Sequence, residues 1–444
     1  MAISNIQDRA AIALEHHNAG RLAEAEVIYR EVLHERADYP AIHHNLGVLL
    51  VNTARVNEGI EQFQKAVVID PEYEPAYWSM AKAMQQACRF KEAAKACEEV
   101  ISINPEHYGA QLALGRLLLK LGQRGRALDL FARTMDLRRG ENRVGPLDNS
   151  LKTTTRAKLL HDIEQFRYLA GQKRDSERVS ALARTYEFAI KSIEWPSDDH
   201  QTISMTEEQV ELFGGSYNYP NFMADAAELP ASTINNDVST DEISKAFKVS
   251  TPGVAWFDNL LTPEALSRLS QYLLGSTIWF DSSHISGFLA SYLEDGLACP
   301  LLLQIADNVR EKFPDILGDH TMTQAWAFKG LIGEKPIDLH LDDAAVSLNF
   351  WLTPDQANLE PGRGGLQIYT KRPPHDWVIK DYDQDKESIK AFIKGYENRK
   401  LTIPYACNRA VLFDSKLFHG SDSPKFLSGY ENYRINITLL FGNS

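Results

Sequence analysis

The sequence has few cysteines and no long apolar run. Its four cysteines, Cys88, Cys97, Cys299 and Cys407, include no CxxC pair, so they fit reduced thiols better than a disulfide framework. No stretch is apolar for long enough to cross a bilayer. The first residues lack the basic region and apolar core of a signal peptide. These absences predict a cytoplasmic protein that does not enter a membrane.

Positive charge is also scarce. The chain carries 47 Lys and Arg against 60 Asp and Glu, a formal net charge of −13. Nucleic acids and anionic membrane surfaces attract basic proteins, so we expect neither as a partner. With 444 residues, of which 44% are hydrophobic, the chain is long enough for two or three domains with buried cores.

A 34-residue repeat organises the first part of the chain. Pro71 and Pro105 stand one period apart, and small residues recur at Gly47, Ala81 and Gly115. A second set of positions with the same 34-residue spacing holds Tyr29, Phe63, Cys97 and Phe131. A small residue lets the two helices of a hairpin pack closely, and a large side chain fills the groove beside it. The pattern resembles the tetratricopeptide repeat, with units at 6–39, 40–73, 74–107 and 108–141.

The resemblance implies an α-helical solenoid over residues 1–145. The concave face of such a solenoid takes a peptide or protein. The fourth unit is rich in arginine, which fits either a solvated face or a contact with an acidic peptide. The repeats could also serve assembly, so a homo-oligomer stays open.

Two further segments precede the last domain. Residues 146–194 have apolar residues at helical spacing, which predicts a helical pair that closes the solenoid. From Trp195 to Ser244 there are ten acidic residues and no Lys or Arg, so 195–247 is predicted to be an acidic connector. Its aromatic residues Phe213, Tyr217, Tyr219 and Phe222 suggest that it is pinned to a surface. A lid over an active site is the alternative.

Residues 248–444 change to a pattern of short strands. Thr262 followed by Pro263 predicts the start of a helix, and a second helix is expected at Cys299–Phe313. The expected strands are Ser276–Asp281, Met322–Phe328, Ile337–Asp342, Ala345–Leu352, Gly365–Tyr369, Leu401–Tyr405, Ala410–Asp414 and Arg434–Phe441. Many short strands separated by turn residues predict an antiparallel jelly roll.

The candidate site begins with His340 and Asp342. In a strand, residues i and i+2 point to the same face, so this imidazole and carboxylate would share one side. His419 completes the set if a later strand lies alongside. Two histidines and one carboxylate leave the opposite face of a metal open, which is typical of non-haem Fe(II) oxygenases.

The order of these elements and motifs resembles the iron(II)- and 2-oxoglutarate-dependent dioxygenases of the prolyl-hydroxylase-like branch. It also resembles a bacterial group that joins tetratricopeptide repeats to this domain. The resemblance implies a double-stranded β-helix, or jelly roll, over 248–444. It implies that His340, Asp342 and His419 bind Fe(II), with 2-oxoglutarate and O2 at the open metal face. The implied activity is hydroxylation of an unactivated C–H bond.

The resemblance assigns Arg434 to the distal carboxylate of 2-oxoglutarate, because its planar fork pairs with carboxylates. More residues than usual separate His419 from Arg434, so Lys425 stays a rival. Asn349, Trp351 and Asn436 are further candidate cofactor contacts, because they would lie on inward-pointing faces; plain barrel packing is the alternative, and the family often has a tyrosine near the place of Trp351.

The substrate inferred from this organisation is an amino-acid side chain in a peptide or protein recruited by the repeats. A small-molecule hydroxylase that uses the repeats only for assembly is one alternative. The others are a non-catalytic scaffold and a jelly roll that binds zinc or manganese without an oxo-acid.

Overall fold

A computed structural model of the chain describes residues 5–143, 149–173, 175–250, 253–283, 286–318, 320–331, 333, 336–373, 386–422 and 424–442. The chain divides into two compact units, Met1–Thr134 and Met135–Ser444. The boundaries predicted at 194/195 and 247/248 therefore do not separate compact units, because the helical pair, the acidic segment and the last domain all belong to the second one.

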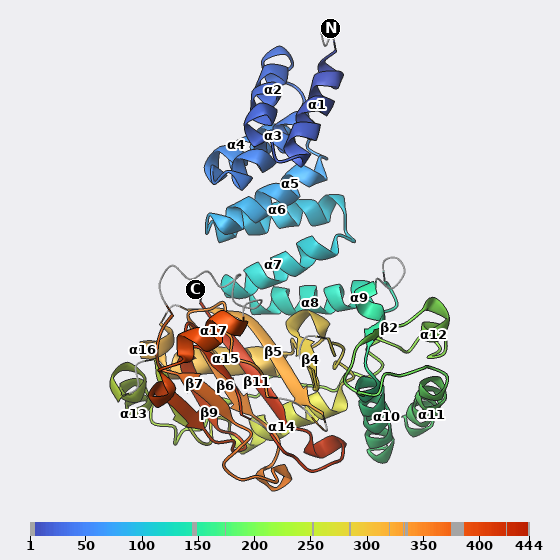
Figure 1. Cartoon of the computed structure of the whole chain (residues 1–444), viewed down its shortest axis with the longest axis vertical. Helices are drawn as coiled ribbons and strands as arrows, with labels where there is room; N and C mark the ends of the chain where they lie inside the picture. The colour runs from blue at the N-terminus through green and yellow to red at the C-terminus, as the bar shows by residue number, and fades with distance from the viewer. Residues whose placement is uncertain are drawn as a thin grey trace. The chain divides into compact units, whose positions relative to one another are not determined.

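The first unit consists of helical hairpins that follow one another along the chain (Figure 1). The helix pairs are α1 (Ile6–Asn18) with α2 (Leu22–Glu35), α3 (Pro40–Asn52) with α4 (Val56–Ile69), α5 (Glu74–Gln86) with α6 (Phe90–Ile103), and α7 (Tyr108–Lys120) with α8 (Arg124–Arg139). The helical repeat region predicted from the sequence is thus confirmed. The boundary between the two units falls within α8.

The repeated small residues of this unit make room for the recurring large ones. A Cβ added to Gly47 would lie 2.5 Å from the Phe63 ring, and one added to Gly115 would lie 3.1 Å from the Phe131 ring. Real Cβ atoms essentially never show the first of these distances. Both rings are buried. The 34-residue periodicity therefore reports close helix packing.

The second unit contains antiparallel sheets. The six-stranded sheet has the order β3-β9-β6-β11-β5-β4 and the three-stranded sheet the order β10-β7-β8. Their bounds are β3 (Val254–Phe257), β4 (Phe288–Tyr292), β5 (Met322–Gly330), β6 (Val346–Trp351), β7 (Leu366–Tyr369), β8 (Lys400–Ile403), β9 (Ala410–Asp414), β10 (His419–Ser421) and β11 (Ile435–Phe441). A separate pair joins β1 (Thr153–Thr154) and β2 (Ile203–Ser204).

The two larger sheets share one apolar core. Trp351 of β6 and Phe413 of β9 belong to the same buried cluster as Leu366, Ile368 and Ile403 of the three-stranded sheet. Because side chains alternate across a strand, Ser347, Asn349 and Trp351 of β6 lie on this face of the six-stranded sheet. This face therefore looks toward the smaller sheet.

Helices flank the sheets of this unit (Figure 1). The predicted helix start is confirmed, since the Thr262 side chain accepts a hydrogen bond from the Ala265 N–H at the start of α14. The helices are α9 (Asn149–Lys152), α10 (Arg156–Gly171), α11 (Ser176–Lys191), α12 (Glu207–Glu211), α13 (Thr240–Lys245), α14 (Pro263–Gly275), α15 (Pro300–Lys312), α16 (Pro314–Leu317) and α17 (Lys386–Ile393). Helix α10 packs against α11, α14 and the short turn Tyr430–Asn432.

The acidic segment is packed along its length. Phe213 and Tyr217 are buried in one cluster with residues of α10 and α11, and the Tyr186 hydroxyl of α11 donates to the Ser216 carbonyl at 3.1 Å. Further along, the Gln304 side chain of α15 accepts from the Leu229 N–H and donates to the Leu229 carbonyl, each at 2.8 Å. The segment is therefore part of the second unit's structure and not a free linker.

Two predicted strands need correction. Ser276–Asp281 forms no strand; Asp281 alone makes an isolated bridge, to Ala290. Ile337–Asp342 is also not a regular strand, because its one bridge is that of His340 with His419. The short strands β3, β4 and β10 were not predicted. Their pairing depends on partners far along the chain, which local alternation does not reveal.

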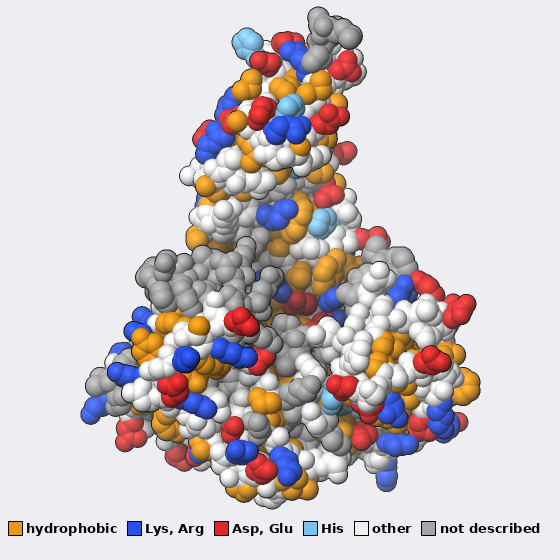
Figure 2. All heavy atoms as spheres, viewed as in Figure 1, with side chains coloured by type: hydrophobic (Ala, Val, Ile, Leu, Met, Phe, Trp, Pro, Cys, Tyr) orange, Lys and Arg blue, Asp and Glu red, His pale blue; other side chains and the backbone are white. Residues whose placement is uncertain are grey.

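The surface carries both signs of charge. Figure 2 shows Lys and Arg side chains interspersed with Asp and Glu on the visible face of the described residues. Within the part of the chain that the structure describes, no helix combines the length and the apolar character needed to cross a membrane.

Candidate metal centre

Three side chains from distant parts of the sequence meet in the second unit. His340, Asp342 and His419 each offer one ligand atom, and these atoms all lie within 4.8 Å of one another. They form the one such group of His, Cys, Asp or Glu found among the described residues. The fold thus brings together the three residues expected from the sequence to bind a metal.

The two histidines face each other across an antiparallel bridge. The His340 N–H donates to the His419 carbonyl at 2.9 Å, and the His419 N–H donates to the His340 carbonyl at 3.0 Å. This reciprocal pair places the two Cα atoms opposite each other with both side chains on one side. The ring centroids are 4.3 Å apart. The later segment expected alongside His340 is thus present, and the contact is an isolated bridge.

Backbone carbonyls fix the tautomer of both rings. Nδ1 of His340 lies 2.9 Å from the Asp338 carbonyl, and Nδ1 of His419 lies 3.0 Å from the Leu417 carbonyl. A carbonyl oxygen only accepts, so Nδ1 carries the proton and Nε2 carries the lone pair. A metal-ligating histidine is commonly oriented by a hydrogen bond of this kind.

Asp342 is held between the histidines and a serine. The Ser347 hydroxyl donates to Asp342 Oδ2 at 2.6 Å. His419 Nε2 lies 3.3 Å from Oδ2, and His340 Nε2 lies 3.9 Å from Oδ1. Ligand atoms about 2.1 Å from a metal and at right angles to each other stand about 3 Å apart. The observed distances are somewhat longer, so the three groups stand close to a common position but slightly farther apart than bound ligands.

Burial and charge act against each other at this centre. Burial by itself would raise the pKa of Asp342, but the charge and hydrogen bond of His419, with smaller effects of His340 and Ser347, lower it below its usual value. Burial would lower the pKa of His419, but the Asp342 carboxylate raises it. The two groups thus stabilise each other's charged forms, and a cation would compete for the carboxylate with the His419 proton.

The three side chains differ in exposure. The His340 side chain is 33% exposed, whereas those of Asp342 and His419 are 3% and 5% exposed. Among the three, His340 is therefore the one in contact with solvent, and the other two are protected by the core.

Arg434 lies just before β11, between the ends of two strands. It is 2% exposed, and the Gly330 N–H at the end of β5 donates to its carbonyl at 2.8 Å. Asn436, two residues on, pairs with Trp351 of β6, and Thr438 pairs with Asn349. Alternation along the strand puts Asn436 and Thr438 on the face that looks toward the smaller sheet.

This face holds buried polar atoms that lack partners. Trp351 Nε1, Asn349 Oδ1 and Asn436 Oδ1 have no hydrogen-bond partner within the described residues, although the Asn349 amide donates to the Thr438 hydroxyl at 2.9 Å. Buried polar groups are nearly always hydrogen-bonded. Since the assignment of amide oxygen and nitrogen follows the partners, these groups suit a ligand with several oxygen atoms.

Two residues near Arg434 refine this picture. Sequence reasoning did not single out Tyr405. Its ring centroid lies 5.6 Å from that of Trp351. Burial raises the pKa of the Tyr405 hydroxyl, and the positive charge of Arg434 acts in the opposite direction. The alternation of Tyr405 with Leu401 and Ile403 was the available signal. The rival Lys425 is 64% exposed and lies 3.4 Å from Glu360, so it is a surface residue.

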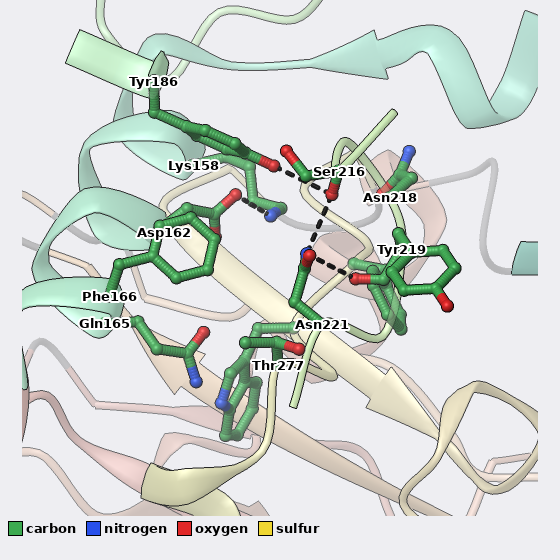
Figure 3. Close-up of a pocket in the computed structure, with 12 residues that line it drawn as sticks. Lys158, Asp162, Gln165, Phe166, Tyr186, Ser216, Asn218, Tyr219, Asn221 and Thr277 are labelled. Carbon is green, nitrogen blue, oxygen red and sulfur yellow. Dashed lines mark hydrogen bonds and ion pairs between the residues drawn. The ribbon is translucent and has the colours of Figure 1, made fainter. Parts of the chain in front are cut away.

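A separate small pocket lies where α10 meets the segment 216–221 (Figure 3). Lys158 and Asp162 of α10 form a buried ion pair in its wall, and the Asn221 side chain donates to the Ser216 carbonyl at 2.9 Å. Most of its polar groups already bind each other (Figure 3). The pocket therefore helps to fasten the acidic segment, and the metal ligands are not among its lining residues.

The family model that matches this chain covers its N-terminal part. Residues 17–86 and 84–146 match the family model of the tetratricopeptide repeat, so the N-terminal region carries these repeats. Similar solved structures include MamA 41-end from Desulfovibrio magneticus RS-1, which is 17% identical over 31% of this chain and 78% of its own, with a TM-score of 0.29.

Two other similar structures are single tetratricopeptide domains. The first TPR of Spaghetti (RPAP3), bound to an HSP90 peptide, is 18% identical over 26% of this chain and 93% of its own, with a TM-score of 0.26. The Arabidopsis OM64 TPR domain is 19% identical over 25% of this chain and 93% of its own, with a TM-score of 0.25.

Proposed function

We propose that the second unit is an Fe(II)- and 2-oxoglutarate-dependent dioxygenase that hydroxylates an unactivated C–H bond. The observation that supports it most is the convergence of His340, Asp342 and His419, with both imidazoles oriented through Nδ1. A hydroxylase further needs a place for the oxo-acid, and the polar face around Arg434 supplies donors for it.

The protein's own residues would hold the metal as follows. His340 and His419 present Nε2. Asp342 presents a carboxylate that also accepts a hydrogen bond from the Ser347 hydroxyl. Two imidazoles and one carboxylate on one face suit Fe(II) and leave sites for other ligands. The burial of Asp342 and His419 keeps bulk water from that side.

Arg434 is the residue proposed for the distal carboxylate of 2-oxoglutarate. It is buried beside Tyr405 and Trp351, whereas the rival Lys425 is exposed. A guanidinium pairs with a carboxylate through two parallel hydrogen bonds. The Trp351 indole N–H and the amides of Asn349 and Asn436 would supply further hydrogen bonds.

A jelly roll is the proposed architecture of this unit. Its support is the pair of antiparallel sheets that share a core, with His340 added beside β10 by an isolated bridge. In that arrangement the metal ligands sit at one edge of the core and Arg434 lies deeper along the six-stranded sheet.

When bound, Fe(II) with 2-oxoglutarate and O2 supplies the oxidising power for C–H hydroxylation. The chain's contribution is to orient the oxo-acid through Arg434, to hold the metal on one face, and to admit the substrate past His340. Proper placement of the reacting C–H bond is what such a site adds to the cofactor's chemistry.

The proposed substrate is an amino-acid side chain in a peptide or protein recruited by the repeats. Tetratricopeptide solenoids present extended binding surfaces. First helices of neighbouring hairpins touch through His44 and Ser79, whose side-chain atoms lie 3.0 Å apart, and beside them Trp78 is half-buried with Lys82 over its ring at 5.2 Å. Such a mixed aromatic and cationic surface suits a peptide with apolar and acidic residues.

Anaerobic titration of the full chain with Fe(II) and 2-oxoglutarate tests the cofactor assignment. The visible metal-to-ligand charge-transfer band should appear in wild type, vanish in His340→Ala and weaken in Arg434→Ala. A wild type that binds iron without this band would refute the oxo-acid assignment. The remaining interpretation would then be a tetratricopeptide scaffold with a metal-binding domain.

The recruiting role is tested with variants of the full chain. Trp78→Ala and Lys82→Glu should lower turnover of an accepted peptide and leave consumption of 2-oxoglutarate without peptide unchanged. Equal activity of these variants on every accepted substrate would favour a small-molecule hydroxylase.

A further inference from the structure

The backbone around Arg434 is fixed between two strand ends. The Gly330 N–H donates to the Arg434 carbonyl at 2.8 Å. On the other side, the Thr353 hydroxyl donates to the Tyr433 carbonyl at 2.8 Å and accepts from the Ile435 N–H at 2.9 Å. Residues 433–435 therefore have little freedom to shift along the sheet. The direction of the Arg434 side chain then depends on the backbone conformation at residue 433.

The side chain of Tyr433 is anchored on the helix α10. Its hydroxyl donates to Glu164 Oε2 at 2.7 Å, and its ring lies 6.2 Å from the buried His161 ring. Tyr433 itself is 6% exposed. The contact joins residues 269 positions apart in sequence, so α10 reaches the chain at the residue directly before Arg434.

A buried lysine lies in the same contact region. Lys329, which precedes Gly330, is fully buried, and its Nζ lies 3.4 Å from the Tyr430 ring centroid and 5.7 Å from that of Tyr433. Lys329 pairs with Ile435 across β5 and β11, so its side chain lies on the face opposite to Asn436. The aromatic cluster thus packs behind the strand ends that carry Arg434.

We propose that Glu164 and Tyr433 are positioning residues for Arg434. The Tyr433–Glu164 hydrogen bond fixes the ring of residue 433, and successive residues of extended chain point to opposite faces. Fixing Tyr433 toward α10 therefore turns Arg434 toward the core between the sheets. This inference rests on the proposed function and extends it, because α10 lies outside the region predicted to form the oxygenase domain.

The test measures 2-oxoglutarate binding by the full chain loaded with Fe(II) under anaerobic conditions. Tyr433→Phe removes the hydroxyl and keeps the ring, and Glu164→Ala removes its acceptor. Each should raise the dissociation constant of 2-oxoglutarate about tenfold. This is the lower end of the range known for residues that orient metal-ligating side chains, which act in a comparable way. Because Tyr433 and Glu164 act through one hydrogen bond, the double variant should bind 2-oxoglutarate no more weakly than either single variant.

Two further measurements separate positioning from general support. Glu164→Gln keeps an acceptor oxygen and should restore most of the affinity, while the Fe(II) affinity should stay at the wild-type value in all three variants. The rise in unfolding temperature produced by 2-oxoglutarate should shrink in Tyr433→Phe and Glu164→Ala. Glu187→Ala is the control matched to Glu164→Ala, since it removes an exposed 2.7 Å pair with Arg167 of α10 and should change neither value.

The outcomes are distinct. Unchanged 2-oxoglutarate affinity in Tyr433→Phe and Glu164→Ala, with or without a lower unfolding temperature, would show that the contact is structural and would overturn this inference alone. Absence of the charge-transfer band in wild type would overturn the proposed function and this inference together.

Discussion

Replacing Ser347 by alanine tests how the metal centre is oriented. The Ser347 hydroxyl donates to Asp342 Oδ2 at 2.6 Å and lies 2.8 Å from the Ser415 hydroxyl, and Ser347 is fully buried. Ser347→Ala leaves the carboxylate with one donor fewer and Ser415 with a vacant bond. A hydrogen bond to a charged group contributes about 1.5–3 kcal/mol.

The expected consequence is weaker metal binding. Because 1.4 kcal/mol corresponds to about a tenfold change in an equilibrium constant, the loss of this bond predicts a 10- to 100-fold lower Fe(II) affinity, about the range known for such supporting contacts. Anaerobic Fe(II) titration gives the affinity directly. Urea unfolding of the metal-free protein should show about 1–3 kcal/mol lower stability, since a buried acceptor loses its donor.

Ser291→Ala is the matched control for this experiment. Ser291 in β4 is also fully buried, but its hydroxyl has no hydrogen-bond partner among the described residues. Removing it should leave metal affinity unchanged and should not lower stability. If Ser347→Ala binds Fe(II) as tightly as Ser291→Ala, the carboxylate does not depend on Ser347 and the proposed orientation of the ligand is wrong.

Three other predictions follow from packing and charge. Gly47→Ala should destabilise the first unit by about 1–3 kcal/mol through a steric clash, whereas Gly125→Ala, with open space around it, should stabilise its helix by about 0.5–1 kcal/mol; thermal unfolding compares them. Burial lowers the pKa of Lys329 well below its usual value, so the unfolded chain binds more protons and stability should rise with pH; Lys329→Met should remove that rise in urea unfolding without loss of stability at pH 7. In the metal-free protein, the pKa of Asp342 is lowered and the pKa of His419 is raised. The Asp342 carboxylate therefore stabilises the fold above pH 3.8, and the His419 imidazolium stabilises it below pH 6.5. The free energy of unfolding should fall as pH rises through the His419 pKa.

The arginines of the fourth repeat illustrate where sequence reasoning left alternatives open. Arg126 pairs with Glu98 at the surface, which agrees with the interpretation as a solvated face. Arg139 is 4% exposed and pairs with the buried Asp295 at 2.7 Å. Both residues are of one type in one helix, so their different environments could not be read from local pattern.

Local sequence pattern was enough to locate the repeats and to nominate the residues of the candidate centre. Repeat positions such as Gly47 and Phe63 are legible because each hairpin contacts mainly its neighbours, so a fixed spacing encodes the packing. His340 and Asp342 were likewise selected by spacing and by the strands around them. These inferences need only short-range geometry, which the chain displays directly.

How these parts meet became visible only in the folded chain. The bridge between His340 and His419, the unpartnered Trp351 Nε1 and the contact of Glu164 with Tyr433 all join residues far apart in sequence. The same reason explains the wrong strand at Ser276–Asp281 and the packed state of the acidic segment. Strand pairing and burial are set by the partner across the contact, and local composition does not specify that partner.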